Sequence, residues 1–189
     1  MIIKIVDYNE NWPLKYAVEA NEIRNAVINN LISIYHIGST AIKEIRAREM
    51  LDILIVVKKT ISIDELVTQL EKLDYNYCKE SDNTRCYSLK KKDNSFCLYV
   101  FYEDQVSEIE KYLAVSLYLK EHHEIAAEYM KVKDTYIKSY LNNKYYQEKK
   151  KFFNEIEIDV ANLLNILTNL NEIEIDACLW YKSKNIHVA

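Results

Sequence analysis

The chain has 189 residues, of which 49% are hydrophobic and 29% charged, a composition typical of a soluble globular protein. The formal net charge of −4 argues against bulk binding of nucleic acid. No apolar stretch approaches the roughly 20 residues of a membrane span, and the first residues are too soon charged for a signal peptide, so we expect a cytoplasmic protein without membrane contact. None of the four cysteines forms a C-x-x-C pair, which favours reduced thiols over a zinc site.

The first part of the chain predicts strands and helices in alternation. Residues 1–7 read as a first strand. Trp12 and Pro13 then open a helix whose apolar residues recur at helical spacing. A strand is expected over 31–37, followed by a Gly-Ser turn and a short helix that ends near Ile45. The apolar run 50–58 is typical of a central strand.

The rest of the chain predicts hairpins followed by helices. Ser62 and Glu65 fit a capping box at the start of a helix. Turn-like residues separate three expected strands, which would form antiparallel hairpins: 74–79, 84–90 and 95–102. Beyond them the apolar spacing indicates three helices, and the alternation at 172–181 suggests a final strand. This order predicts an α+β fold with a mixed or antiparallel sheet, flanking helices and a helical C-terminal half.

The only glycine of the chain, Gly38, lies where a strand would turn into a helix. Glycine lets backbone approach a ligand closely, so Gly38 and Ser39 could hold phosphate, while Thr40 could cap the helix or assist. Asp52 follows in a strongly apolar strand, where a carboxylate is costly unless it is paired or binds a metal. Together these residues fit a site for a triphosphate with Mg²⁺ or Mn²⁺. The alternative is an ordinary turn and an aspartate that pairs with Arg48.

Two basic residues flank the proposed site. His36 could contact a phosphate, act as a base, or be a hydrogen-bonded structural histidine. Arg48 could neutralise phosphate charge with its planar guanidinium, or form a salt bridge with Asp52 or Glu49. Both residues are therefore candidates for the nucleotide site.

These motifs resemble those of a known family. A Gly-Ser pair followed, after a spacer, by Asp52 and Ile53 is similar to the signature of polymerase-β-type nucleotidyltransferases. The chain looks still more like the GrpB-like family of predicted nucleotidyltransferases, and the matching segments are Tyr8 to Pro13, His36 to Ile42 and Leu51 to Leu54. The resemblance implies a nucleotidyltransferase fold. With the Gly-Ser turn and Asp52, it leads us to expect a nucleoside triphosphate as ligand and an acceptor of unknown identity.

The chain departs from that pattern where metal ions would be held. The second metal-binding acid of the wider superfamily is Leu54 here, and the third strand carries Cys97 and Tyr99 instead of an acid. A two-metal mechanism needs about two or three carboxylates at one point, and only Asp52 is in place. Four other acids could substitute: Glu49, Asp82, Glu103 and Asp104.

The sequence therefore predicts a nucleotidyltransferase-like protein in which Asp52 is the catalytic and metal-binding residue. The residues expected at the nucleotide are His36, Gly38, Ser39, Thr40 and Arg48. The alternative is a catalytically degenerate module that binds a phosphate-bearing ligand or a protein partner. We expect residues 1–155 to form the nucleotidyltransferase-like domain, and 156–189 to form an extension that packs on it or makes a homodimer.

Overall fold

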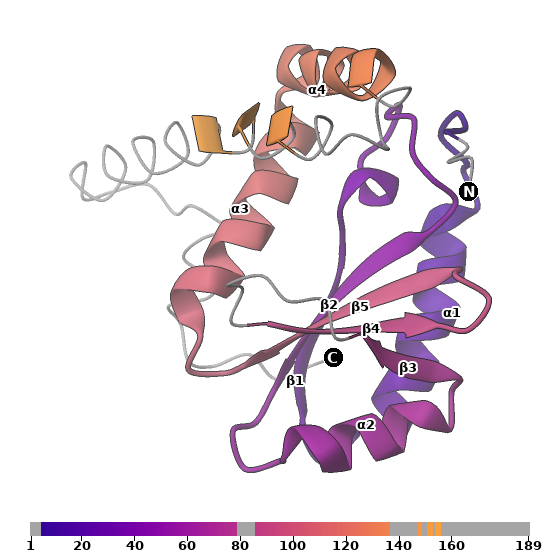
Figure 1. Ribbon diagram of the computed structural model, residues 1–189, viewed down its shortest axis with the longest axis vertical. Coiled ribbons are helices and arrows are strands. Elements are labelled where there is room, and N and C mark those ends of the chain that lie inside the picture. Colours follow the sequence, from indigo (N-terminus) through magenta and orange to yellow (C-terminus); the bar gives the residue numbers. More distant parts are fainter. Residues whose placement is uncertain (1–4, 79–85, 137–146, 149–150, 153, 156–189) are drawn as a thin grey trace. The chain divides into compact units, whose positions relative to one another are not determined.

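The computed structural model describes residues 5–78, 86–136, 147–148, 151–152 and 154–155 (Figure 1). The chain divides into two compact units, Met1–Ile109 and Glu110–Ala189. The first unit contains every strand of the described sheet. Two helices, α3 (Val106–Glu121) and α4 (His123–Tyr136), follow the sheet in the chain and confirm the helical character expected after the last strand. The extension 156–189, with its expected strand and dimer contact, lies outside the described residues, so the boundary at residue 155 stays a prediction.

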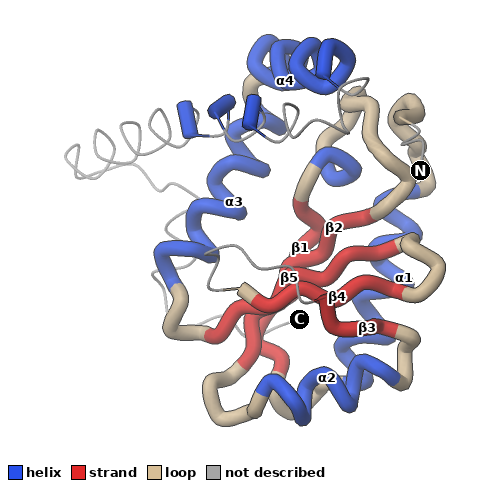
Figure 2. Tube along the Cα trace, in the orientation of Figure 1, coloured by secondary structure: helices blue, strands red, loops and turns tan. Residues whose placement is uncertain are grey.

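The first unit is built on one mixed sheet, drawn in red in Figure 2. Its strands are β1 (Leu31–Ile37), β2 (Leu51–Val57), β3 (Tyr75–Cys78), β4 (Tyr87–Lys91) and β5 (Phe96–Tyr102). They lie in the order β1-β2-β5-β4-β3, with β2 and β5 parallel and the other neighbours antiparallel. The predicted α+β class, its mixed sheet and its two antiparallel hairpins are thereby confirmed.

One face of this sheet carries the hydrophobic core. Successive residues of a strand point to opposite faces, and alternate residues of β2, from Leu51 to Val57, face α1 (Trp12–Ala26) and α2 (Ile63–Glu71). Trp12 and Ile23 of α1 are almost completely buried in this core. The intervening residues of β2, among them Asp52, therefore face the other side of the sheet.

Two expected elements differ from the structure. Of the strand expected over 1–7, residues 1–4 lie outside the described residues, and residues 5–7 form only an isolated bridge between Val6 and Ala47. The helix expected to reach Ile45 is a single 3-10 turn, η1 (Ser39–Ala41). It stops because Ile42 adopts an extended conformation and Glu44 has a φ of +67°, both incompatible with a continuing right-handed helix. The capping of α2 is confirmed on one side, since the backbone N–H of Glu65 donates to Ser62 Oγ at 3.2 Å.

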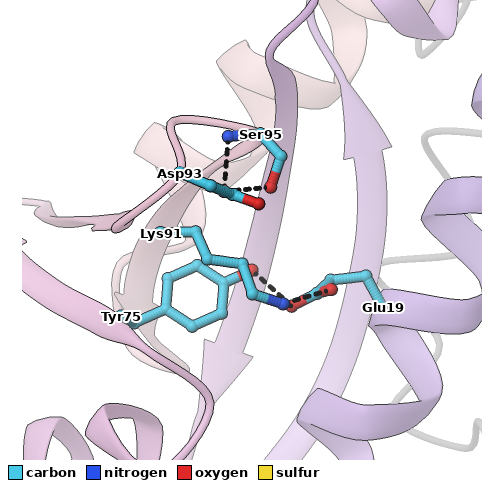
Figure 3. A network of polar contacts seen from close by, with 5 residues as sticks. All are labelled: Glu19, Tyr75, Lys91, Asp93 and Ser95. Atoms are coloured by element: carbon cyan, nitrogen blue, oxygen red, sulfur yellow. Dashed lines mark hydrogen bonds and ion pairs between the residues drawn. The ribbon is translucent and has the colours of Figure 1, made fainter.

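A buried polar network fastens α1 to the sheet (Figure 3). Lys91 Nζ donates to both carboxylate oxygens of Glu19 at 2.7 Å, and the Tyr75 hydroxyl donates to Glu19 Oε1 at 3.0 Å. The ammonium group also lies over the Tyr75 and Phe96 rings, 5.7 and 5.4 Å from their centroids. Burial, together with the Glu19 carboxylate, raises the pKa of the Tyr75 hydroxyl, which keeps this group protonated as a donor.

Among the described residues, no helix has the length and apolar character needed to cross a lipid bilayer.

Candidate functional site

Gly38 and Asp52 lie in direct contact. A Cβ placed on Gly38 would stand 2.5 Å from Asp52 Oδ2 and 3.1 Å from Asp52 Cβ. The contact arises because Ile37, the last residue of β1, pairs with Asp52 on β2, so the chain turns directly beside the carboxylate. The backbone of the turn and the strand aspartate therefore converge on one point, as the sequence led us to expect.

The conformation of Gly38 explains why glycine stands here. Its φ of +70° and ψ of −170° fall in a region that is open essentially to glycine alone. Glu44, Asp74 and Asn94 also have positive φ, so this chain builds other tight turns without glycine. Gly38 differs from these residues in a second respect. The Asp52 carboxylate lies 2.5 Å from the point where a Cβ of residue 38 would stand, so a side chain has no room there.

Asp52 is the carboxylate that the strand pairing brings to this turn. Its half-buried side chain lies on the face opposite the helix-packed core, where Leu54, the next β2 residue on that face, is fully buried. Cys97 of β5 pairs with Asp52, and Tyr99 pairs with Leu54. Across the part of the chain that the structure describes, no group of three or more His, Cys, Asp or Glu side chains could hold a metal ion.

Two of the alternative acids, Glu103 and Asp104, lie far from Asp52. Glu103 and Asp104 follow the end of β5, about 20 Å along the strand direction from the level of Asp52. There they bind Lys59: Glu103 Oε1 accepts from the Lys59 backbone N–H at 3.1 Å, and Asp104 pairs with the Lys59 ammonium group, whose hydrogen bond lowers the pKa of Asp104. Glu49 is exposed, and Asp82 lies outside the described residues.

His36 is held in place by two neighbours. Its ring stacks on Tyr16 of α1, with centroids 4.9 Å apart and planes 13° from parallel. The Tyr16 hydroxyl donates to the carbonyl of Ile34 at 3.1 Å, and His36 Nε2 shares a 2.9 Å hydrogen bond with Thr40 Oγ1. His36 pairs with Ile53 and so faces α1, while Asp52 faces the other side. The ring stacking and the hydrogen bond support the structural interpretation of His36, and a direct phosphate contact stays a prediction.

The other predicted residues occupy different positions around the turn. Ser39 is half-buried and begins η1, directly after Gly38. Thr40 is only 1% exposed, so its side chain supports the turn from inside. The Arg48 side chain is exposed. Its role at a phosphate therefore stays a prediction, as does that of Ser39.

Tyr16 is a residue of the site that the sequence did not indicate. It lies one turn of helix away from Ala20 on the apolar face of α1, where spacing alone suggests core packing. The pairing of its ring with His36 depends on where α1 crosses β1, which periodicity does not reveal. We infer that Tyr16 and Thr40 together fix the ring of His36 and hence the start of the turn.

Replacing Thr40 by valine tests this arrangement. Valine keeps the shape of threonine but removes the hydroxyl that binds His36, so we expect the free energy of unfolding to fall by about 1 kcal/mol. Urea unfolding followed by circular dichroism measures the change. Thr68→Val is the control, because the exposed Thr68 hydroxyl bonds only to the carbonyl of Asp64 within its own helix. Equal effects of the two substitutions would contradict the supporting role of Thr40.

Comparison with known proteins places the chain in a family. The family model described as GrpB protein matches residues 2–158, which is most of the chain. The chain belongs to the GrpB family. This confirms the resemblance that the Gly38 and Asp52 segments suggested.

Individual relatives agree with this assignment. The chain is 30% identical over 132 residues to UPF0157 protein BH1888 of Halalkalibacterium halodurans, a match that covers 69% of this chain and 67% of the relative. It is 29% identical over 132 residues to UPF0157 protein YqkA of Bacillus subtilis, covering 69% of this chain but only 38% of that protein. The chain thus spans about two thirds of one relative and less than half of the other.

A solved structure has the same fold. The crystal structure of conserved protein GrpB from Enterococcus faecalis superposes with a TM-score of 0.76 at 24% identity, over 85% of this chain and 99% of that one. The similarity covers the fold of nearly the whole bacterial relative. At 24% identity this similarity establishes the fold. It does not identify a ligand.

Proposed function

We propose that this protein binds a nucleoside triphosphate together with one divalent cation, Mg²⁺ or Mn²⁺, in the manner of a nucleotidyltransferase. The observation that carries the proposal is the contact between Gly38 and the Asp52 carboxylate. Phosphate groups held against the backbone at Gly38 and Ser39 would be next to a cation on Asp52. Such a cation and its phosphates would share oxygen ligands, as magnesium sites with nucleotides do.

The donor set fits one cation rather than two. Magnesium is bound through one or two carboxylates, several waters and substrate phosphates, so a single aspartate is a sufficient protein contribution. A second cation would need further carboxylates, and the adjacent position on the same strand face is the fully buried Leu54. A cation on Asp52 would leave a positive charge at the turn, which favours the triphosphate.

Each residue of the site would have a distinct part in that complex. The bound cation would neutralise phosphate charge and polarise the phosphorus–oxygen bonds. Asp52 would hold it from a rigid central strand. The backbone at Gly38 would approach the phosphates closely because no Cβ intervenes. Thr40 and His36 would keep the turn in the conformation that permits this approach.

Asp52→Asn provides the test. Calorimetric titration with a nonhydrolysable triphosphate should show binding by the wild type that strengthens at least about tenfold when Mg²⁺ replaces EDTA. The variant should lose this dependence, because an amide is a far weaker cation ligand than a carboxylate. Asp104→Asn is the matched control, since Asp104 is engaged with Lys59 at the other end of β5. Failure of every triphosphate to bind, with Mg²⁺ or Mn²⁺, would overturn the proposal.

A second candidate is a phosphate-binding module without turnover. The buried Leu54 favours it, because a second cation needs further carboxylates and the described residues contain no group of three or more metal-ligating side chains. This candidate predicts that binding survives EDTA and the Asp52→Asn substitution. The same titration therefore separates the two functions.

A further inference from the structure

A row of side chains crosses the sheet at the level of Asp52. Strand pairing aligns Asp52 of β2 with Cys97 of β5, Cys97 with Lys90 of β4, and Lys90 with Asn76 of β3. Paired residues of adjacent strands point to the same face, so these four residues form a continuous line, which we name the polar row. Strands lie about 4.8 Å apart, which places Asp52 and Lys90 about 10 Å from each other between Cα atoms.

The electrostatic environment of Cys97 agrees with this geometry. Burial, reinforced by the negative charge of Asp52, raises the pKa of the Cys97 thiol to about 12, while a hydrogen bond with Tyr99 and the positive charge of Lys90 act in the opposite direction. Both charged groups are thus close enough to Cys97 to influence its ionisation. The thiol itself remains protonated and neutral, so it does not cancel either charge.

Lys90 lies on the opposite face of the sheet from Lys91. Lys91 faces the helix-packed core and binds Glu19, and Lys92 pairs with Asp74 at the turn that precedes β3. Lys90 faces the side of the sheet that carries Asp52, and its side chain is half-buried. An ammonium group presents three hydrogen-bond donors and no acceptor, which suits a phosphate or a carboxylate.

Gly38 and the rest of the polar row lie on opposite sides of Asp52. Gly38 lies on the β1 side of Asp52, whereas Cys97, Lys90 and Asn76 lie on the β5 side. In phosphoryl transfer the attacking and leaving oxygens stand roughly in line on opposite sides of the phosphorus. If the triphosphate occupies the Gly38 side, the second reactant would lie on the β5 side of Asp52.

We infer that the polar row binds the acidic group of that second ligand, so the acceptor carries a phosphate or a carboxylate. This inference rests on the proposed function, which supplies the triphosphate on the Gly38 side. Lys90 contacts the acidic group and determines the charge of the acceptor. On the third strand, where nucleotidyltransferases carry a metal-binding acid, this chain has the neutral thiol of Cys97, which lies beside Lys90.

Nuclear magnetic resonance of the full chain tests this inference with inorganic phosphate and acetate as probes. Each probe is titrated into protein saturated with Mg²⁺ and a nonhydrolysable triphosphate, and the backbone amides of Cys97 and Lys90 are followed. We expect saturable shifts at these amides, an affinity loss of about tenfold or more in Lys90→Gln, and recovery in Lys90→Arg. The probe that binds more tightly identifies the acidic group.

Lys92→Gln is the matched control and should bind both probes like the wild type, because Lys92 pairs with Asp74 away from the polar row. Absence of saturable shifts at Cys97 and Lys90, or equal binding by Lys90→Gln and wild type, would overturn the inference. The response of Gly38 and Ser39 to the triphosphate is recorded in the same samples. If these two respond while the polar row does not, the inference alone fails. If they never respond, the proposed function fails.

Discussion

The substitution Gly38→Ala is expected to lower the free energy of unfolding by about 1–3 kcal/mol and to weaken triphosphate binding more than about tenfold. Two costs combine. An alanine at a φ of +70° and a ψ of −170° is strained, and its Cβ would lie 2.5 Å from Asp52 Oδ2. Either the turn or the carboxylate must move, and both belong to the proposed site. Denaturant unfolding and calorimetric titration measure the two effects.

A double-mutant cycle with Asp52→Ala separates these costs. Without the carboxyl group the collision is relieved, so Gly38→Ala should destabilise the Asp52→Ala protein less than it destabilises the wild type. The remaining loss would come from the backbone strain and from the 3.1 Å contact with the Cβ that alanine keeps at position 52. If Gly38→Ala lowers the free energy of unfolding equally in both proteins, the contact between Gly38 and Asp52 does not exist as described.

The substitution Glu19→Ala is expected to lower the free energy of unfolding by about 3 kcal/mol. It removes the acceptor of both Lys91 hydrogen bonds and of the Tyr75 hydroxyl, and leaves an ammonium group beside two aromatic rings. We place the effect near the lower end of the range for breaking a buried ion pair, because the Lys91 side chain keeps 24% of its surface exposed. Denaturant unfolding provides the measurement.

A neighbouring ion pair offers the control for this prediction. Lys92 and Asp74 form a salt bridge at 2.6 Å, but their side chains are 61% and 62% exposed. Lys92→Ala should therefore change stability by no more than about 1 kcal/mol. A Glu19→Ala effect as small as that of Lys92→Ala would show that the buried network does not fasten α1 to the sheet.

Local patterns predicted the strands and the central contact. The bounds of β1 match those expected, and β2 differs from its predicted range by one residue at each end, because apolar runs bounded by turn residues define strands well. The meeting of Gly38 with Asp52 followed from their order along the chain: a turn directly after one strand lies beside the start of the next when the two pair antiparallel. These predictions needed only neighbours in sequence.

Features that depend on pairing between distant segments could not be predicted in this way. The stacking of Tyr16 on His36 requires the crossing position of α1, and the alignment of Asp52 with Cys97 and Lys90 requires the parallel register of β2 and β5. The burial of Glu19 could have been predicted, since this residue lies three positions after Tyr16 on the apolar face of α1. A charged residue on such a face indicates a buried partner, but not which lysine it is.

The predicted length of the helix after Gly38 was wrong because a tertiary contact competes with the helix. Residues 39–45 contain no proline or glycine, so the pattern allowed a helix to Ile45. The structure instead extends the chain at Ile42 and turns it through Glu44, after which Ala47 pairs with Val6. Tertiary pairing overrides helix propensity in such a short segment.

The most direct test of the account is a crystal structure of the protein with Mn²⁺ and a nonhydrolysable nucleoside triphosphate, with the metal located by its anomalous scattering. We predict one manganese ion bound to an Asp52 carboxylate oxygen and to phosphate oxygens that lie against the backbone of Gly38 and Ser39. A triphosphate bound elsewhere, or a manganese ion that does not contact Asp52, would contradict the account.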